Sequence, residues 1–275
     1  MQMKVKFAKK YGFCFGVKRA IRIAERNQHA TTFGPLIHNS REIERLQKDF
    51  DVSLSRSLEE AQKFKSVIVR THGITKDDLQ VLKEHHTHII DATCPFVTKP
   101  QQIVEKMSQE GYQIIIFGDN SHPEVKGVAS YGDDVAIIAN IDELKHLTLK
   151  KKVALVSQTT KQPEHFGKIA ALLVSLVNEC RIFNTICSAT FENQFAVDEL
   201  SREADIMVIV GGKNSSNTKQ LFKIAKEYCT DSYLIEDENE IDNTWFVGKE
   251  LCGITAGAST PDWIISRVQE KIEQI

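Results

Sequence analysis

The stretch Asp91-Ala92-Thr93-Cys94-Pro95-Phe96 marks a junction between an extended segment, ending in Ile89-Ile90, and a helical one. Similar junctions occur at Gly12-Phe13-Cys14-Phe15-Gly16 and at Asn184-Thr185-Ile186-Cys187-Ser188. At each junction a cysteine precedes apolar residues that recur at helical spacing. Three cysteines in equivalent places indicate an internal repeat that decides the fold.

Each copy of the repeat continues with a short apolar strand that ends in glycine and leads into a polar loop. The spacing from cysteine to glycine is 20, 24 and 24 residues, measured to Gly34, Gly118 and Gly211. A further strand and a second polar loop follow in every copy. The first two copies then end in a strand that runs into the next cysteine, whereas the third copy lacks it. We therefore expect the N-terminal strand Lys4-Val5-Lys6-Phe7 to complete the third sheet.

Alternating strands and helices predict an α/β fold with mainly parallel sheets. We expect three similar α/β units in a pseudo-threefold, trefoil-like arrangement about a common axis. The expected units are residues 12–93, residues 94–184, and residues 185–275 together with 1–11. The alternative is an ordinary alternation of strands and helices without such symmetry. Ligands of parallel sheets bind beyond the carboxyl ends of the strands, where all three junction cysteines and the polar loops lie.

Composition restricts the classes of function. The 275 residues are 41% hydrophobic and 26% charged, with a formal net charge of −2. This is typical of a globular chain of two or three domains, and it provides no general attraction for nucleic acid or for an anionic membrane. Because the sequence also lacks a long apolar stretch and a signal-peptide core, we expect a cytoplasmic protein that binds neither nucleic acid nor membrane.

Six cysteines in a cytoplasmic chain favour thiols, metal ligands or catalytic groups over a disulfide framework. Three of them lie in ordinary helix or strand patterns and are interpreted as small buried hydrophobic residues: Cys180, Cys229 and Cys252. The junction residues Cys14, Cys94 and Cys187 are expected to meet and to hold a metal centre. Zinc sites usually bring cysteines as C-x-x-C pairs, which this chain lacks. An iron–sulfur cluster with one iron open to substrate is therefore favoured.

The polar loops carry groups that suit an anion. His38, His72 and His122 occupy corresponding loop positions in the first two copies. The third copy supplies short hydrogen-bond donors instead, namely Ser215, Ser216, Asn217 and Ser259. These loops lead into helix N-termini, where exposed N–H groups and the helix dipole favour negative charge. A phosphate or diphosphate fits such loops better than a sugar or an apolar ligand.

Glu124 is the loop carboxylate that we expect to act as a general acid or proton relay. A structural role is the alternative, because Ser121-His122-Pro123-Glu124 also matches a helix capping box. Thr159 could orient a substrate hydroxyl or simply end a strand. Nicotinamide and ATP sites are disfavoured, since neither G-x-G-x-x-G nor G-x-x-x-x-G-K-[ST] occurs.

Nine motifs in this order resemble those of the 4-hydroxy-3-methylbut-2-enyl diphosphate reductase family, and they span nearly the whole chain. They are Gly12-Phe13-Cys14-Phe15-Gly16-Val17, Ile37-His38-Asn39, His72-Gly73, Asp91-Ala92-Thr93-Cys94-Pro95, His122-Pro123-Glu124-Val125, Gln158-Thr159-Thr160, Asn184-Thr185-Ile186-Cys187, Asn214-Ser215-Ser216-Asn217 and Ala256-Gly257-Ala258-Ser259-Thr260-Pro261. The resemblance implies the last step of the non-mevalonate isoprenoid pathway. In that step an allylic hydroxyl is removed reductively, which gives isopentenyl and dimethylallyl diphosphate.

The resemblance also implies roles for individual residues. A central [4Fe–4S] cluster would be held by Cys14, Cys94 and Cys187, with the substrate hydroxyl on its open iron. Catalysis would fall to Glu124, Thr159 and His122. The diphosphate would be bound by His38, His72, His122, Ser215, Ser216, Asn217 and Ser259.

The implied partners are an allylic diphosphate substrate and an electron donor such as ferredoxin or flavodoxin. One departure from the family pattern is Asn193, which stands where the family usually has arginine before Gln194. This difference puts in doubt an ion pair near the third junction cysteine.

Two other functions share some of these features. A hydro-lyase would use the same open iron to dehydrate a phosphorylated small molecule without net electron transfer. A non-catalytic zinc- or iron-binding protein would use the cysteines only for structure.

Overall fold

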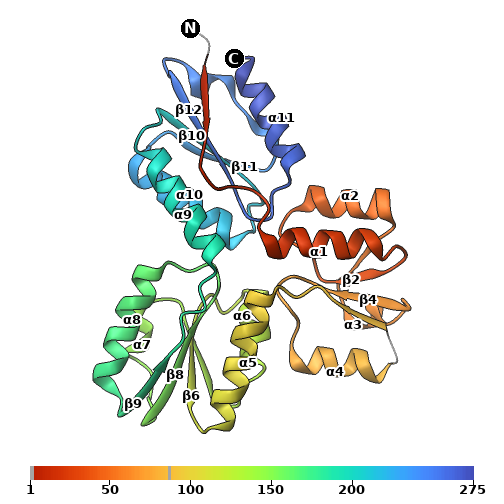
Figure 1. The fold of residues 1–275 in the computed structure, drawn as a ribbon, viewed down its shortest axis with the longest axis vertical. Helices are drawn as coiled ribbons and strands as arrows, with labels where there is room; N and C mark the ends of the chain where they lie inside the picture. The colour runs from red at the N-terminus through yellow and green to blue at the C-terminus, as the bar shows by residue number, and fades with distance from the viewer. Residues whose placement is uncertain (1–2, 86–87) are drawn as a thin grey trace. The chain divides into compact units, whose positions relative to one another are not determined.

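The protein is described by a computed structural model covering residues 3–85 and 88–275, and it contains three four-stranded sheets (Figure 1). Their strand orders are β3-β2-β4-β5, β7-β6-β8-β9 and β11-β10-β12-β1. All neighbouring strands pair in parallel. When the strands are numbered within their own copy of the repeat, every sheet has the order second, first, third, fourth. The expected α/β class with three similar parallel sheets is therefore confirmed.

The first sheet consists of β2 (Thr31–Phe33), β3 (Ser53–Ser55), β4 (Ser66–Val69) and β5 (His88–Asp91). Its copy of the repeat contributes the helices α1 (Phe15–Arg26), α2 (Ser40–Phe50), α3 (Leu58–Ala61) and α4 (Lys76–Glu84). Helix α4 begins at a capping threonine, because the Thr75 hydroxyl accepts a hydrogen bond from the Asp78 N–H at 3.1 Å. Buried Val67, Val69 and Leu82 join this helix to the sheet.

The second sheet consists of β6 (Gln113–Phe117), β7 (Val135–Ile138), β8 (Lys152–Ser157) and β9 (Glu179–Ile182). The accompanying helices are α5 (Pro95–Gln109), α6 (Pro123–Ala129), α7 (Ile141–Leu144) and α8 (Pro163–Leu176). Strand β6 is buried on both faces, with Ile114 and Ile116 in one hydrophobic cluster and Ile115 and Phe117 in another. A continuous apolar run of this kind is expected of a parallel strand covered by helices on both sides.

The third sheet consists of β10 (Ile206–Val210), β11 (Ser232–Ile235), β12 (Leu251–Ala256) and β1 (Lys4–Phe7). Its helices are α9 (Ser188–Ser201), α10 (Ser216–Tyr228) and α11 (Asp262–Glu273), with the short 3₁₀ helices η1 (Glu238–Glu240) and η2 (Asn243–Phe246). Helices α9 and α10 pack on one face of the sheet and α11 on the other (Figure 1).

Strand β1 lies beside β12, in parallel, with Lys4 opposite Leu251 and Phe7 opposite Ile254 (Figure 1). The expectation that the N-terminal strand completes the third sheet is therefore confirmed. One strand in each copy was not expected from the sequence, namely β3, β7 and β11. All three occupy an edge of their sheet, and β3 is only three residues long.

Packing divides the chain into two compact units. One contains Met1–Lys18, His38–Glu44 and Ser188–Ile275, and the other contains Arg19–Ile37 and Arg45–Cys187. The first unit holds the third sheet, and the second holds the other two. The boundaries 12–93, 94–184 and 185–275 with 1–11, and the pseudo-threefold arrangement about an axis, stay predictions.

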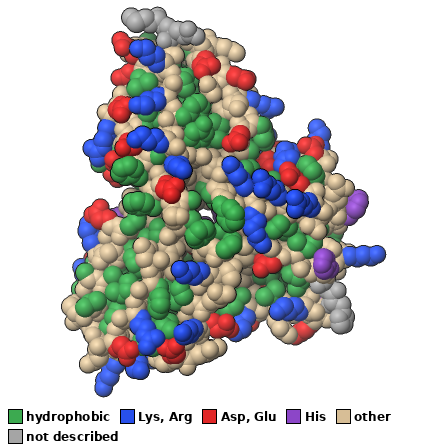
Figure 2. All heavy atoms as spheres, in the orientation of Figure 1, with side chains coloured by type: hydrophobic (Ala, Val, Ile, Leu, Met, Phe, Trp, Pro, Cys, Tyr) green, Lys and Arg blue, Asp and Glu red, His purple; other side chains and the backbone are tan. Residues whose placement is uncertain are grey.

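The surface combines a near-neutral overall charge with a local concentration of basic groups. Figure 2 shows lysine and arginine side chains gathered over α1, where Lys18, Arg22 and Arg26 are located. Within the described part of the chain, no helix has both the length and the apolar composition that a membrane crossing requires.

Candidate active site

The three junction cysteines have the same local structure. Each lies directly before a helix, since α1 begins at Phe15, α5 at Pro95 and α9 at Ser188. The backbone N–H of each cysteine donates a hydrogen bond to a carbonyl in the loop after the neighbouring strand. The acceptors for Cys14, Cys94 and Cys187 are, in that order, Ala258 at 3.2 Å, Thr71 at 3.0 Å and Thr159 at 3.0 Å. The local equivalence predicted from the repeat is thus present in all three copies.

The cysteines differ in their exposure. Cys14, Cys94 and Cys187 are half-buried, and none of the described cysteines forms a disulfide. Cys229 and Cys252 are buried, as expected, and burial raises the pKa of Cys252 to about 12. Such a thiol stays protonated, which makes it a poor metal ligand. Cys180 packs against a hydrophobic cluster of the second sheet, as a small hydrophobic residue should, but it is half-buried rather than buried.

The half-buried junction cysteines fit a cluster that is held by thiolates and remains accessible to substrate. They also lie at the N-termini of helices, where the dipole favours the negative charge of metal-bound thiolates. Cys94 and Cys187 lie in one compact unit, and Cys14 lies in the other. That the three meet stays a prediction.

Glu124, in the first turn of α6 rather than in a loop, forms a buried pair with Thr159, which follows β8. The Glu124 side chain is 2% exposed, and its carboxylate accepts two hydrogen bonds from the same residue. The Thr159 N–H donates to Oε1 at 2.7 Å, and the Thr159 hydroxyl donates to Oε2 at 2.7 Å. Since the Thr159 carbonyl also accepts from the Cys187 N–H, one residue links the carboxyl group to a junction cysteine.

The carboxylate of Glu124 does not cap its helix. His122 is the N-cap of α6, and its Nδ1 accepts a hydrogen bond from the Glu124 N–H at 3.2 Å. This contact requires the proton of a neutral His122 ring to reside on Nε2. His72 lies edge-on to the same ring, with the centroids 5.5 Å apart. The capping-box interpretation of Glu124 is therefore wrong, and its role as a general acid stays a prediction.

Burial raises the pKa of Glu124, although the two hydrogen bonds from Thr159 partly oppose that shift. A carboxyl with a raised pKa holds its proton closer to neutral pH, which suits a general acid.

The raised pKa of Glu124 also makes stability depend on pH. Because the folded state holds the Glu124 proton more tightly than the unfolded chain, this contribution to stability is present at low pH and is lost as pH rises through the raised pKa. We expect Glu124→Gln to lose less stability than the wild type between mildly acidic and neutral pH. Thermal unfolding of both proteins across that pH range measures this difference. Equal changes of stability with pH in the two proteins would contradict the prediction.

Further side chains hold the loops after β6 and β8 together, and they were not identified from the sequence. The Gln158 Oε1 accepts from the Asp119 N–H at 2.9 Å, and the Lys161 ammonium bonds the Asp119 carboxylate at 2.7 Å. Gln158 stands in a quoted motif, but Asp119 and Lys161 resemble ordinary surface charges in the sequence. Only their position beside neighbouring strand ends reveals that they fix the segments of Glu124 and Thr159.

The predicted anion-binding residues of the other compact unit lie around the start of α10. The Ser215 hydroxyl caps this helix by accepting from the Thr218 N–H at 3.3 Å, and Ser216 is its first residue. The Ser259 hydroxyl donates to the carbonyl of His38 at 3.2 Å. Neighbouring loops therefore bring together His38, Ser215, Ser216 and Ser259.

Asn217 provides the sharpest sign that this region binds a ligand. Its side chain is 4% exposed, yet neither amide atom has a hydrogen-bond partner within residues 3–85 and 88–275. Unsatisfied buried amides cost free energy, so such a group calls for a water or a ligand. An anion at the N-terminus of α10 would accept from the Asn217 amide and from the exposed backbone N–H groups.

The site residues are divided between the two units. Those of the unit with the first two sheets are His72, Cys94, His122, Glu124, Thr159 and Cys187, and those of the other unit are Cys14, His38, Ser215, Ser216, Asn217 and Ser259. Asn193 is buried on α9, and the effect of this departure stays a prediction.

Comparison with known proteins identifies close relatives along the whole chain. A protein from Nitratiruptor sp. is 59% identical over 273 residues, covering 99% of each chain. A protein from Helicobacter pylori is 61% identical over 274 residues, covering 99% of this chain and 100% of the relative. Both are named 4-hydroxy-3-methylbut-2-enyl diphosphate reductase.

Solved structures agree with these relatives. The structure of (E)-4-hydroxy-3-methyl-but-2-enyl diphosphate reductase, described as the terminal enzyme of the non-mevalonate pathway, is 37% identical, with a TM-score of 0.72 over 99% of this chain and 100% of that one. The E-1-hydroxy-2-methyl-but-2-enyl-4-diphosphate reductase from Plasmodium falciparum is 25% identical, with a TM-score of 0.91 over 100% of this chain and 88% of that one. A family model described as LytB protein matches residues 5–273. The chain therefore belongs to the LytB protein family.

Proposed function

We propose that this protein is an oxidoreductase that removes the allylic hydroxyl of 4-hydroxy-3-methylbut-2-enyl diphosphate. Two electrons and two protons are consumed, the C–O bond breaks, water leaves, and isopentenyl or dimethylallyl diphosphate forms. Family membership supports this substrate. The observation that carries the chemistry is the buried Glu124 carboxyl on Thr159, because Thr159 also fixes a junction cysteine.

The proposed cofactor is a [4Fe–4S] cluster held by Cys14, Cys94 and Cys187. When bound, such a cluster supplies electrons and an iron that lacks a protein ligand. The half-buried state of these cysteines and their common position before helices support the assignment. Zinc is disfavoured because this chain has no C-x-x-C pair.

The residues of the chain would bind substrate and deliver protons. Glu124 holds a proton at its carboxyl because burial raises its pKa, and the Thr159 hydroxyl orients that carboxyl. His122, the N-cap beside Glu124, would keep the helix start in place and contact the diphosphate. His38, His72, Ser215, Ser216, Asn217 and Ser259 would provide the remaining diphosphate contacts.

An external electron donor is required by the stoichiometry. We propose a small redox protein such as ferredoxin or flavodoxin, and we place the reaction in the cytoplasm. The net charge of −2 supports neither nucleic acid nor an anionic membrane as a partner.

Turnover with and without reductant tests the proposed reaction. The anaerobically purified protein should convert 4-hydroxy-3-methylbut-2-enyl diphosphate to the two products only when a reduced donor is supplied. Dehydration that proceeds without reductant would favour the hydro-lyase. A colourless protein that contains zinc and no acid-labile sulfide would favour the non-catalytic alternative.

A further inference from the structure

The segment His38–Glu44 belongs to the compact unit of the third sheet, although it follows a strand of the first. The His38 carbonyl lies close to two other loops of that unit. It accepts a hydrogen bond from the Ser259 hydroxyl at 3.2 Å, and a Cβ added at Gly212 would lie only 2.3 Å from its oxygen. This close approach requires glycine at position 212. The hydrogen bond from Ser259 helps to fix the backbone of His38, a residue that is predicted to bind the diphosphate.

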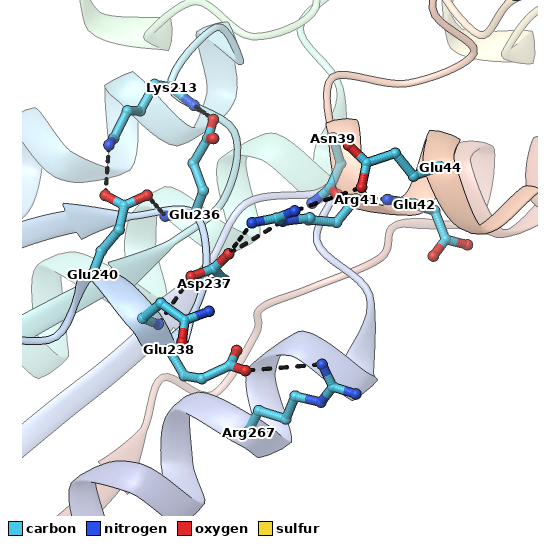
Figure 3. Close-up of polar contacts among 11 residues, drawn as sticks. Asn39, Arg41, Glu42, Glu44, Lys213, Glu236, Asp237, Glu238, Glu240 and Arg267 are labelled. Atoms are coloured by element: carbon cyan, nitrogen blue, oxygen red, sulfur yellow. Dashed lines mark hydrogen bonds and ion pairs between the residues drawn. The ribbon is translucent and has the colours of Figure 1, made fainter.

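Arg41 ties the same segment to the turn after β11. Its Nε and Nη2 donate to one oxygen of Asp237, at 3.1 and 2.8 Å, as Figure 3 shows. Asp237 is 7% exposed, and its other oxygen accepts from the Asn239 N–H at 2.9 Å. Burial raises the pKa of Asp237, but the hydrogen bonds from Arg41 and Asn239 outweigh it and hold the pKa below its ordinary value. The Asp237 carboxylate is therefore charged although it is largely shielded from water.

A second anchor lies one residue further along. Glu42 is 1% exposed, and its carboxylate accepts from the indole N–H of Trp263 on α11 at 3.1 Å. The Glu42 N–H donates to the Asn39 side chain at 3.0 Å, which caps α2. The helix start next to His38 is therefore fixed in both position and direction.

The turn that holds Arg41 also holds the loop before α10. The Lys213 N–H donates to the Glu236 carboxylate at 2.8 Å, and the Lys213 ammonium pairs with Glu240 (Figure 3). Glu240 also accepts from the Glu236 N–H at 3.2 Å. Residues 236–240, here named the acidic turn, thus bind two of the three segments that carry predicted diphosphate-binding residues in this unit; the third is the loop of Ser259.

We propose that the acidic turn positions the His38 segment and the start of α10, Ser215–Asn217, for the diphosphate, with Arg41 and Asp237 as positioning residues. The inference rests on the proposed function, since it assigns the two segments to the same ligand. Neither Arg41 nor Asp237 was selected from the sequence. Their role is to hold residues that bind substrate, so their loss acts on substrate affinity more than on the chemical step.

The test compares Arg41→Ala with the wild-type holoenzyme. We expect KM for 4-hydroxy-3-methylbut-2-enyl diphosphate to rise about tenfold while kcat stays within about twofold. The inhibition constant of inorganic pyrophosphate, used as a competitive inhibitor, should rise by a similar factor. Arg41→Lys keeps the charge but loses the two-donor geometry, so it should fall between the wild type and the alanine variant.

Arg202→Ala is the matched control, because Arg202 makes an equally direct pair with Asp198 in the same unit, at 3.0 Å for both contacts, and directly follows the last residue of α9, outside both segments. Its KM should equal that of the wild type. Asp237→Asn keeps the size of the side chain and provides a second test if Arg41→Ala does not fold. An Arg41→Ala or Asp237→Asn enzyme with wild-type KM, or one that loses only kcat, would overturn the inference.

Failure of the proposed function would give a different result. If the wild-type holoenzyme does not turn over the substrate, the proposed reaction is wrong. Direct calorimetric binding of pyrophosphate would still decide the positioning role, because Arg41→Ala should weaken that binding whether or not the reaction is correct. Equal pyrophosphate affinity in the two proteins would contradict the role of the acidic turn.

Discussion

Cys94→Ser is expected to yield a folded protein without an intact iron–sulfur cluster and with turnover near background. Serine replaces the thiolate with an oxygen that iron in such clusters binds poorly. Because Cys94 is half-buried at the start of α5, the change removes a ligand without creating a core cavity. Anaerobic iron and sulfide analysis, with an EPR or Mössbauer spectrum, measures the loss.

Cys180→Ser is the matched control for this experiment. Cys180 is also half-buried, but it lies within β9 rather than at a junction. Its variant should retain the iron and sulfide content and the activity of the wild type. Full cluster content in the Cys94 variant, or equal loss in both variants, would show that the repeat does not identify the ligands.

Glu124→Gln should leave the cluster spectrum unchanged and lower turnover by about a hundredfold or more, which is the usual contribution of a positioned general acid. Glutamine keeps the shape of the side chain and can still contact Thr159, but it has no proton of suitable acidity to give. The effect should fall on kcat, because the loss concerns proton delivery rather than substrate binding. Single-turnover kinetics with a chemical reductant would separate the two.

Glu164→Gln provides the comparison, since Glu164 is an exposed carboxylate paired with Lys168 on α8. That variant should keep wild-type activity. A Glu124→Gln enzyme with an unchanged rate would instead return Glu124 to a structural role beside the capping His122.

Much of the fold could be predicted from the sequence because the repeat is strong in the buried strands. Apolar runs such as Ile114–Phe117 can be assigned to buried strands, because similar runs recur at matching distances from each junction cysteine. The edge strands β3, β7 and β11 were missed, whereas the opposite edge strands β1, β5 and β9 were expected because each leads toward a junction cysteine. The missed strands have no such landmark, and β3, with the sequence Ser-Leu-Ser, also lacks an apolar run.

For the candidate site, the sequence was sufficient to predict which residues could contact a ligand. The pairing of Glu124 with Thr159 became visible only when neighbouring strand ends were placed together. Arg41 and Asp237 could not be selected, because they are 196 positions apart and each resembles an ordinary surface charge until their contact is known. Supporting side chains of this kind depend on the tertiary fold, which local patterns do not encode.

The pairing of β1 with β12 has a consequence for how the protein matures. The Cys14 N–H bonds the carbonyl of Ala258, so this cysteine acquires its backbone partner only after the chain has been synthesised as far as Ala258. Until then β1 has no sheet to join, because contacts between distant positions wait for the later residue. In a nascent chain that stops before β12, we expect Cys14 to lack the backbone hydrogen bond that fixes its position. Insertion of the cluster would then follow synthesis of the third sheet rather than accompany it.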